Sequence, residues 1–195
     1  MKWNCSLFTR TLTAALAGAV LTVAAHAAEP TALELIKEGN RHVGEDSKDK
    51  VTQIRSEKSV GGLAPSVWFV VFYDADARMK ATEVKFGAGK KLDVVRPFRL
   101  FERISGEKAM DRAKLKVDSD EVLRLVQKEP LLSRVKLTNT RMTLEKNGDG
   151  AAVWTVVLWA EKARRPTETV DIGKLVLKAE DGVIIERDLH IERTE

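Results

Sequence analysis

The sequence uses one apolar pattern twice, and this likeness restricts the possible folds more than any other feature. Residues 66–72 (SVWFVVF) align with residues 152–158 (AVWTVVL), so that Trp68 and Trp154 occupy the same place 86 residues apart. Self-similarity at a fixed distance is typical of a chain that repeats one supersecondary unit. We therefore expect two halves of similar architecture.

Local signals follow the same order in each half. Thr31 with Glu34, and Asp118 with Glu121, are typical of capping boxes that open a short helix. Alternating apolar and polar residues around turn residues then predict hairpins, and the strand segments are 51–58, 83–94, 135–146 and 174–185, with 147–150 as a turn. The sequence predicts an α+β fold of two tandem repeats, each a helix packed on an antiparallel sheet of about four strands.

Residues 1–27 have the pattern of a cleavable signal peptide. Lys2 and Arg10 precede an apolar stretch shorter than the roughly 20 residues that cross a bilayer, and residues 25–27 (AHA) form a signal peptidase site. We expect cleavage after Ala27, a periplasmic or secreted protein, and no transmembrane segment after cleavage. The first repeat would then span 28–96, a charged connector 97–116 and the second repeat 117–195.

Removal of the signal also changes the available chemistry. Cys5, the single cysteine, leaves with it, which excludes disulfides, thiolate metal sites and a cysteine nucleophile. The formal charge falls from +4 to +2, too small a surplus for a nucleic-acid-binding protein. His42 and His190 are the histidines that remain. We expect no cofactor, no metal site and no catalytic residues.

One histidine has acidic neighbours. Asp188, His190 and Glu192 alternate with Leu189 and Ile191, so a strand would place the three polar side chains on one face. The preferred interpretation is a solvent-facing polar surface opposite buried leucine and isoleucine. The alternative is a set of proton carriers or metal ligands that a second strand would complete.

The two tryptophan strands are apolar on both faces. In the first, Trp68 and Phe72 share one face and Phe69 and Tyr73 share the other. Either a helix covers one face and the other half of the chain covers the second, or the second face is open and binds a partner. The candidate binding residues come from these strands and the loop 161–167, whose cations could contact an acidic partner or anionic headgroups; they are Trp68, Tyr73, Trp154, Trp159, Arg164 and Arg165.

The second half, through residues 118–123, 144–156 and 174–185, resembles a PepSY-type or cystatin-like module, in which a helix precedes a sheet with a glycine-containing hairpin. The first half looks like a degenerate copy, with Lys91 where Gly182 would fall. A tandem pair is similar in architecture to secreted β-lactamase inhibitory proteins. The resemblance implies an exported inhibitory or binding unit that works through a sheet surface.

These observations lead us to expect an exported, non-catalytic binding protein. It would act as an inhibitor of a peptidase or another enzyme, or as an envelope chaperone, and bind an exported or envelope protein through a sheet face or loop tips. One alternative is a small-ligand carrier or enzyme with an apolar pocket under the sheet, where Asp188 and His190 would do the chemistry. Another is a structural envelope protein whose segment 98–101 contacts membrane or peptidoglycan.

Overall fold

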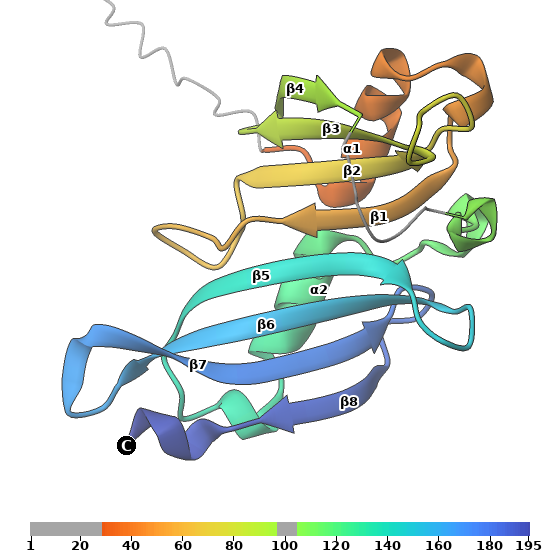
Figure 1. The fold of residues 1–195 in the computed structure, drawn as a ribbon. Helices are drawn as coiled ribbons and strands as arrows, with labels where there is room; N and C mark the ends of the chain where they lie inside the picture. The colour runs from red at the N-terminus through yellow and green to blue at the C-terminus, as the bar shows by residue number, and fades with distance from the viewer. Residues whose placement is uncertain (1–28, 97–104) are drawn as a thin grey trace, which may run out of the picture.

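The structure is a computed structural model that describes residues 29–96 and 105–195, so the predicted signal peptide and residues 97–104 of the predicted connector lie outside the described residues. Eight strands form a single antiparallel sheet in the order β4-β3-β2-β1-β5-β6-β7-β8 (Figure 1). The helices and strands are α1 (Ala32–Gly39), β1 (Val51–Ser56), β2 (Val67–Tyr73), β3 (Ala81–Gly87), β4 (Lys90–Val95), α2 (Ser119–Gln127), β5 (Leu137–Lys146), β6 (Ala152–Lys162), β7 (Arg165–Lys178) and β8 (Ile184–Leu189). Short 3-10 turns accompany them: η1 (Asn40–His42), η2 (Glu45–Ser47), η3 (Gly106–Lys108), η4 (Arg112–Lys114), η5 (Pro130–Leu132) and η6 (Ile191–Thr194).

The predicted fold class, two repeats each with its own sheet of about four strands, is wrong. β1 and β5 pair in antiparallel register, with Ile54 opposite Leu144 and Arg55 opposite Thr143, and this ladder joins all eight strands. An unpaired strand edge leaves backbone N–H and C=O groups without partners. Each half would leave one edge of its first strand open, and pairing β1 with β5 removes both edges at once.

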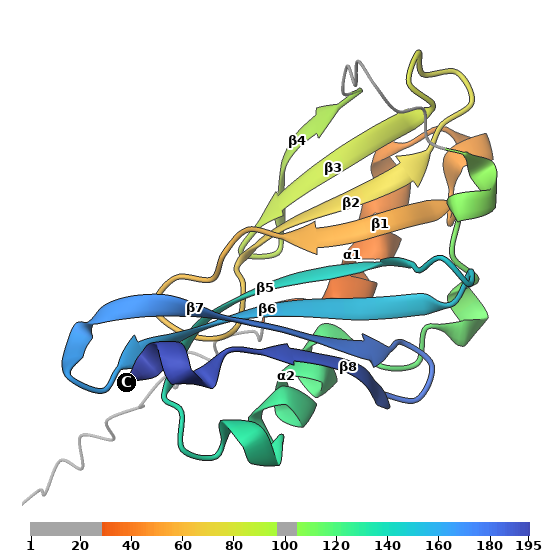
Figure 2. The same cartoon turned by 60° about the horizontal axis from the view of Figure 1, so that its bottom comes forward.

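Both helices pack on the same side of the sheet (Figures 1 and 2). Beneath them lies one apolar cluster that includes Trp68 and Phe86 from the first half and Trp154 and Leu175 from the second. The Trp68 and Trp154 rings meet edge to face, with centroids 6.5 Å apart. The halves therefore lie edge to edge and share a core, and the interpretation in which one half covers the sheet of the other is wrong.

The helices begin where the sequence predicts, after the N-caps Thr31 and Asp118. The sequence does not indicate that these caps bond to each other. The Thr31 hydroxyl donates to Asp118 Oδ2 at 2.6 Å, and the Leu33 and Ser119 N–H groups donate to Asp118 Oδ1 at 3.0 and 2.7 Å. One carboxylate thus serves the N-terminal ends of both helices, where unsatisfied N–H groups and the helix dipole favour a negative charge.

The described part of the predicted connector, residues 105–116, packs against one end of the sheet. Its charged residues are exposed, but Met110 and Leu115 belong to the apolar cluster. The Met110 N–H donates to the Val51 carbonyl at 2.8 Å. In residues 29–96 and 105–195 no helix combines the length and apolar character needed to cross a membrane.

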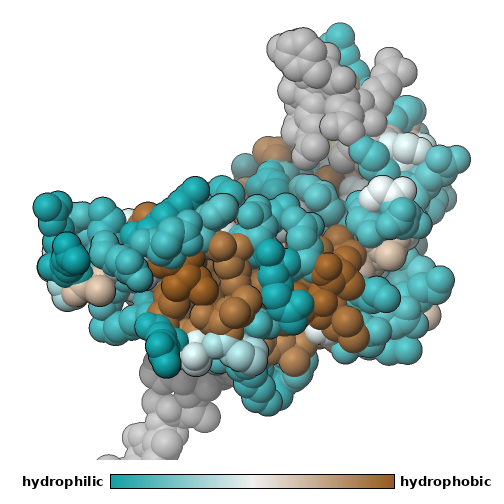
Figure 3. All heavy atoms as spheres, turned by 90° about the horizontal axis from the view of Figure 1, so that it is seen from below, coloured by the Kyte–Doolittle hydropathy of each residue, from teal (hydrophilic) through white to brown (hydrophobic). Residues whose placement is uncertain are grey.

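The side of the molecule that carries α2, η5 and β8 shows apolar surface between polar margins (Figure 3). η5 contributes Leu131, the turn before β8 contributes Val183, and β8 contributes Ile185, each exposed by between 44% and 53%. This apolar surface lies away from the outward-facing residues of β2 and β6 that the sequence predicts to bind a partner. A substitution on it can therefore serve as a control for substitutions at those residues.

Candidate binding surface on the open face of the sheet

The sheet face opposite α1 and α2 carries the candidate binding surface. Figure 1 looks onto this face, which we call the open face and define by the outward-pointing side chains of Arg55, Phe69, Tyr73, Arg141 and Trp159. Successive side chains of a strand point to opposite faces. Because the alternate residues of β2 and β6 enter the core, their neighbours in sequence must point outward.

Two cations lie close to the indole of Trp159. The Lys58 ammonium nitrogen is 4.2 Å from the ring centroid, and the guanidinium carbon of Arg141 is 5.8 Å from it. Lys58 and Arg141 are exposed, Trp159 is half-buried, and neither cation has an ion pair with a described carboxylate. Cation–π contacts of this kind are attractive, so the two cations and the ring form one cluster on the open face.

Phe69 has similar neighbours but a different charge balance. Arg55 and Lys85 lie 4.0 and 5.0 Å from its ring centroid. Arg55 also pairs with Glu83 at 2.5 Å, and Lys85 pairs with Glu57 at 3.0 Å. The Phe69 end of the open face is therefore neutralised internally, whereas the Trp159 end is not.

Two of the predicted binding residues are part of the core. Trp68 and Trp154 are 4% and 0% exposed, and their indole N–H groups donate to the carbonyls of Pro65 and Val117 at 3.0 and 2.9 Å. Their assignment as partner anchors is corrected, because their strand positions face the helices. Tyr73 does lie on the open face, where it packs on Val71 and Ala81.

Arg164 lies in the turn between β6 and β7, and Arg165 is the first residue of β7, at the tip of the long hairpin (Figure 1). Arg165 and Lys162 both bond to Glu168 at 3.1 Å, and these hydrogen bonds lower the pKa of Glu168. Arg164 is exposed. Arg164 follows Trp159 by five residues, and at about 3.3 Å per residue the chain between them spans up to roughly 17 Å, so one partner could contact both.

The structure brings Asp188, His190 and Glu192 together, although β8 ends at Leu189 and Glu192 belongs to η6. The Asp188 and Glu192 carboxylates lie 3.3 and 3.5 Å from Nε2 and Nδ1 of His190. All three side chains are at least 41% exposed, so water competes for each contact. No group of three or more His, Cys, Asp or Glu within the described ranges has the arrangement of a metal site.

Sequence reasoning missed Lys58 and Arg141 as parts of the open face, and it placed Phe69 on the face with Tyr73 without naming it as a binding residue. Arg141 had a usable signal, since it alternates with the buried Met142 on β5 and must point away from the core. Lys58 had none. It lies in the loop after β1, and its contact with Trp159 depends on the β1–β5 pairing.

An apolar pocket under the sheet, the feature that a small-ligand carrier needs, finds little support. A pocket of about 110 Å³ lies beside Trp68, between Pro30, Pro65 and Leu123. Sites for drug-sized ligands occupy roughly 300–1,000 Å³. The space between sheet and helices is filled by side chains such as Trp154 and Phe72, which are inaccessible to solvent.

Comparisons with protein-family models, with curated proteins and with solved structures find no match. The PepSY-type or cystatin-like resemblance therefore stays a prediction that rests on the residues quoted for it.

Proposed function

We propose that this chain is a non-catalytic binding protein that holds an exported or envelope protein against the open face of its sheet, at the Trp159 end. The observation that carries this proposal is the half-buried indole of Trp159 beneath Lys58 and Arg141, two exposed cations without a carboxylate partner among the described residues. Tryptophan and arginine are the residues that most often dominate the energy of protein interfaces.

The charge of this site indicates the partner's chemistry. A partner with aspartate or glutamate side chains would supply the counter-charges that Lys58 and Arg141 lack, and Arg164 would extend the same positive surface toward the hairpin tip. Complementary charge raises the association rate and selects among partners. The Phe69 end, with its internal ion pairs, would form a polar margin of the interface.

The proposal is tested with the tagged chain 28–195 and an envelope extract. We expect one retained protein in stoichiometric amount, identified by mass spectrometry. Trp159→Ala should weaken its affinity by at least about thirtyfold, as for an interface hot spot, and Arg141→Gln should mainly lower the association rate and its dependence on salt. Leu131→Ala is the matched control, because Leu131 is an exposed apolar residue away from the open face.

Two outcomes would contradict the proposal. If nothing is retained above an unrelated exported control, the chain does not act through a stable protein partner. If a partner is retained by Trp159→Ala but lost with Leu131→Ala, binding uses the α2–β8 side instead of the open face.

A further inference from the structure

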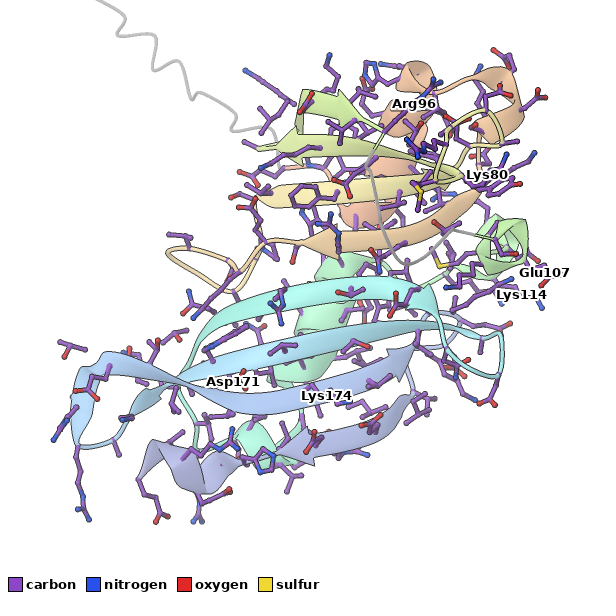
Figure 4. All side chains as sticks on the ribbon, viewed as in Figure 1. Lys80, Arg96, Glu107, Lys114, Asp171 and Lys174 are labelled. Atoms are coloured by element: carbon purple, nitrogen blue, oxygen red, sulfur yellow. The ribbon has the colours of Figure 1, made fainter. Side chains whose placement is uncertain are left out.

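A second charged feature lies at the end of the sheet where β5 turns into β6. There η4, the β5–β6 turn and the end of β7 enclose a pocket of about 200 Å³. Figure 4 labels Lys114 of η4 and Glu107 at this end of the molecule, close to that turn. The volume is several times the roughly 30 Å³ that one liquid water occupies, so the pocket can hold a small polyatomic ion with part of its hydration shell.

Three lysines from distant parts of the chain line this pocket: Lys114, Lys146 and Lys178. Strand pairing determines two of their positions, because Lys146 lies opposite Ala152 on β6 and Lys178 lies opposite Val153. The Lys146 ammonium group also donates to the Glu107 carbonyl at 2.8 Å. This hydrogen bond holds the Lys146 ammonium group at Glu107, which is not one of the residues that line the pocket.

The two carboxylates of the lining are engaged elsewhere. Asp111 is the N-cap of η4 and accepts the Ala113 N–H at 3.0 Å. Glu180 lies 3.6 Å from the Lys116 ammonium group. Lys114 and Lys178 form no ion pair with a carboxylate in the described ranges. The lining holds three lysines against two carboxylates, a formal charge of +1, and the ammonium groups of Lys114 and Lys178 are available to a ligand.

We infer that this pocket binds a phosphate group, either as free phosphate or as a small phosphomonoester. A phosphate carries nearly two negative charges at neutral pH and offers several acceptor oxygens in a tetrahedral arrangement. Lysine binds phosphate as a point charge, so the two available ammonium groups of Lys114 and Lys178 suit it. A carboxylate has one charge and a planar pair of oxygens that fits the fork of arginine better.

The test is a titration of the chain 28–195, followed by amide NMR at constant ionic strength, with inorganic phosphate, glycerol 3-phosphate, citrate and chloride as separate probes. We expect saturable shifts for residues 150–152 and Lys178 with one or both phosphate probes, and none with chloride. Saturation by inorganic phosphate indicates a free-ion site, and saturation by glycerol 3-phosphate alone indicates a monoester site. Lys114→Gln and Lys178→Gln should each weaken binding about tenfold, the loss of one charge-assisted hydrogen bond.

Lys128→Gln is the matched control, since Lys128 is an exposed lysine at the end of α2 and outside the pocket. It should change the affinity less than twofold. Because Lys114 and Lys178 are exposed, their variants should unfold at the wild-type temperature, which separates loss of binding from loss of the fold. The inference is overturned if phosphate shifts match those of chloride, if citrate binds more tightly than either phosphate probe, or if the pocket variants behave like Lys128→Gln.

Discussion

Asp118 joins two helices that begin 87 residues apart, counted from Thr31 to Asp118. Its carboxylate accepts hydrogen bonds from the Thr31 hydroxyl and from the N–H groups of Leu33 and Ser119. Loss of one helix cap costs about 1 kcal/mol. Asp118→Ala removes capping at two helices, so we expect the free energy of unfolding to fall by about 2–3 kcal/mol in urea denaturation.

Asp120→Ala is the control for this variant. Asp120 is the next acidic residue of α2 and makes one exposed contact, with Arg124 at 3.7 Å. Its removal should change the unfolding free energy by less than about 0.5 kcal/mol. Equal effects of the two substitutions would show that Asp118 does not link the helices.

Gly173 occupies a position in β7 that accepts no side chain. Its φ is +99°, and a Cβ atom there would lie 2.0 Å from the Asp188 carbonyl oxygen on β8. We expect Gly173→Ala to lower the unfolding free energy by about 2–4 kcal/mol, through backbone strain and displacement of β8. Gly148→Ala serves as the comparison because Gly148 has open space around its Cβ position. Calorimetric midpoints that coincide for the two variants would contradict this account.

The acid stability of the protein depends on Asp74, which lies in the β2–β3 turn with Lys80 and contacts Arg96 from the end of β4; Figure 4 labels Lys80 and Arg96. Burial by itself would raise the pKa of Asp74, but hydrogen bonds from the Thr82 hydroxyl and the Asp76 N–H, together with the charge of Arg96, outweigh burial and hold the pKa below its usual 3.8. A carboxyl whose pKa is lowered by folding stabilises the protein above the unfolded-state pKa and loses this effect as the pH falls through the folded-state pKa.

Asp74→Asn tests this linkage. The wild type should be more stable than the variant at about pH 6, and the difference in unfolding free energy should shrink as the pH falls below about 4. Urea denaturation at a series of pH values measures the difference directly. A difference that stays constant down to about pH 2.5 would mean that folding does not lower the pKa of Asp74.

The two outermost strands, β4 and β8, carry features that oppose further strand pairing. β4 and β8 each contain one extra residue relative to their neighbour: Leu92 lies between the pairs formed by Lys91 and Asp93, and Ile185 between those formed by Ile184 and Glu186. Such bulges distort the open ladder of an edge strand, and charged side chains make association costly. All six side chains of β4 are exposed, and half of them are charged.

We therefore expect the wild-type chain to be monomeric at about 100 µM, a concentration at which exposed strand edges aggregate. The double variant Lys91→Val, Asp93→Val keeps the strand but removes its protecting charges, and it should self-associate through β4. Light scattering coupled to size-exclusion chromatography gives the molar mass of the wild type and of the double variant. The control is the double variant Lys128→Val, Arg134→Val, which adds two valines at exposed positions outside the strands and should stay monomeric. If this control also self-associates, the association of the β4 variant is due to added hydrophobic surface and not to the strand edge.

Elements of the second half could be predicted closely from local chemistry. The segment 135–146 corresponds to β5, the turn 147–150 closes through a hydrogen bond from the Gly150 N–H to the Asn147 carbonyl at 3.0 Å, and the cap Asp118 opens α2. These features depend on neighbours in sequence. The open-face site required knowledge of which strands are adjacent, since Lys58 and Trp159 belong to different halves, and no local pattern encodes that contact.

At the scale of the whole molecule, strand alternation could not distinguish two sheets from one. A strand with one buried and one solvent-facing side has the same pattern in a four-stranded and in an eight-stranded sheet. The difference depends on three residue pairs between β1 and β5 and on hydrogen bonds such as that from the Met142 N–H to Ser56 Oγ at 2.9 Å. The Trp68–Trp154 contact extends this link into the core, where side chains from both halves belong to one cluster.

A shared core should make both halves unfold together. Val84 on β3 is fully buried in the first half, and Val84→Ala should cost about 2 kcal/mol through lost burial and a small cavity. In native-state hydrogen exchange, the most protected amides report global unfolding. If the halves are one cooperative unit, protection in β6 of the second half falls by the same free energy as protection in β2, because the amides of both strands exchange through the same unfolded state. Unchanged protection in β6 beside a loss in β2 would show that the β1–β5 ladder joins two units that unfold independently.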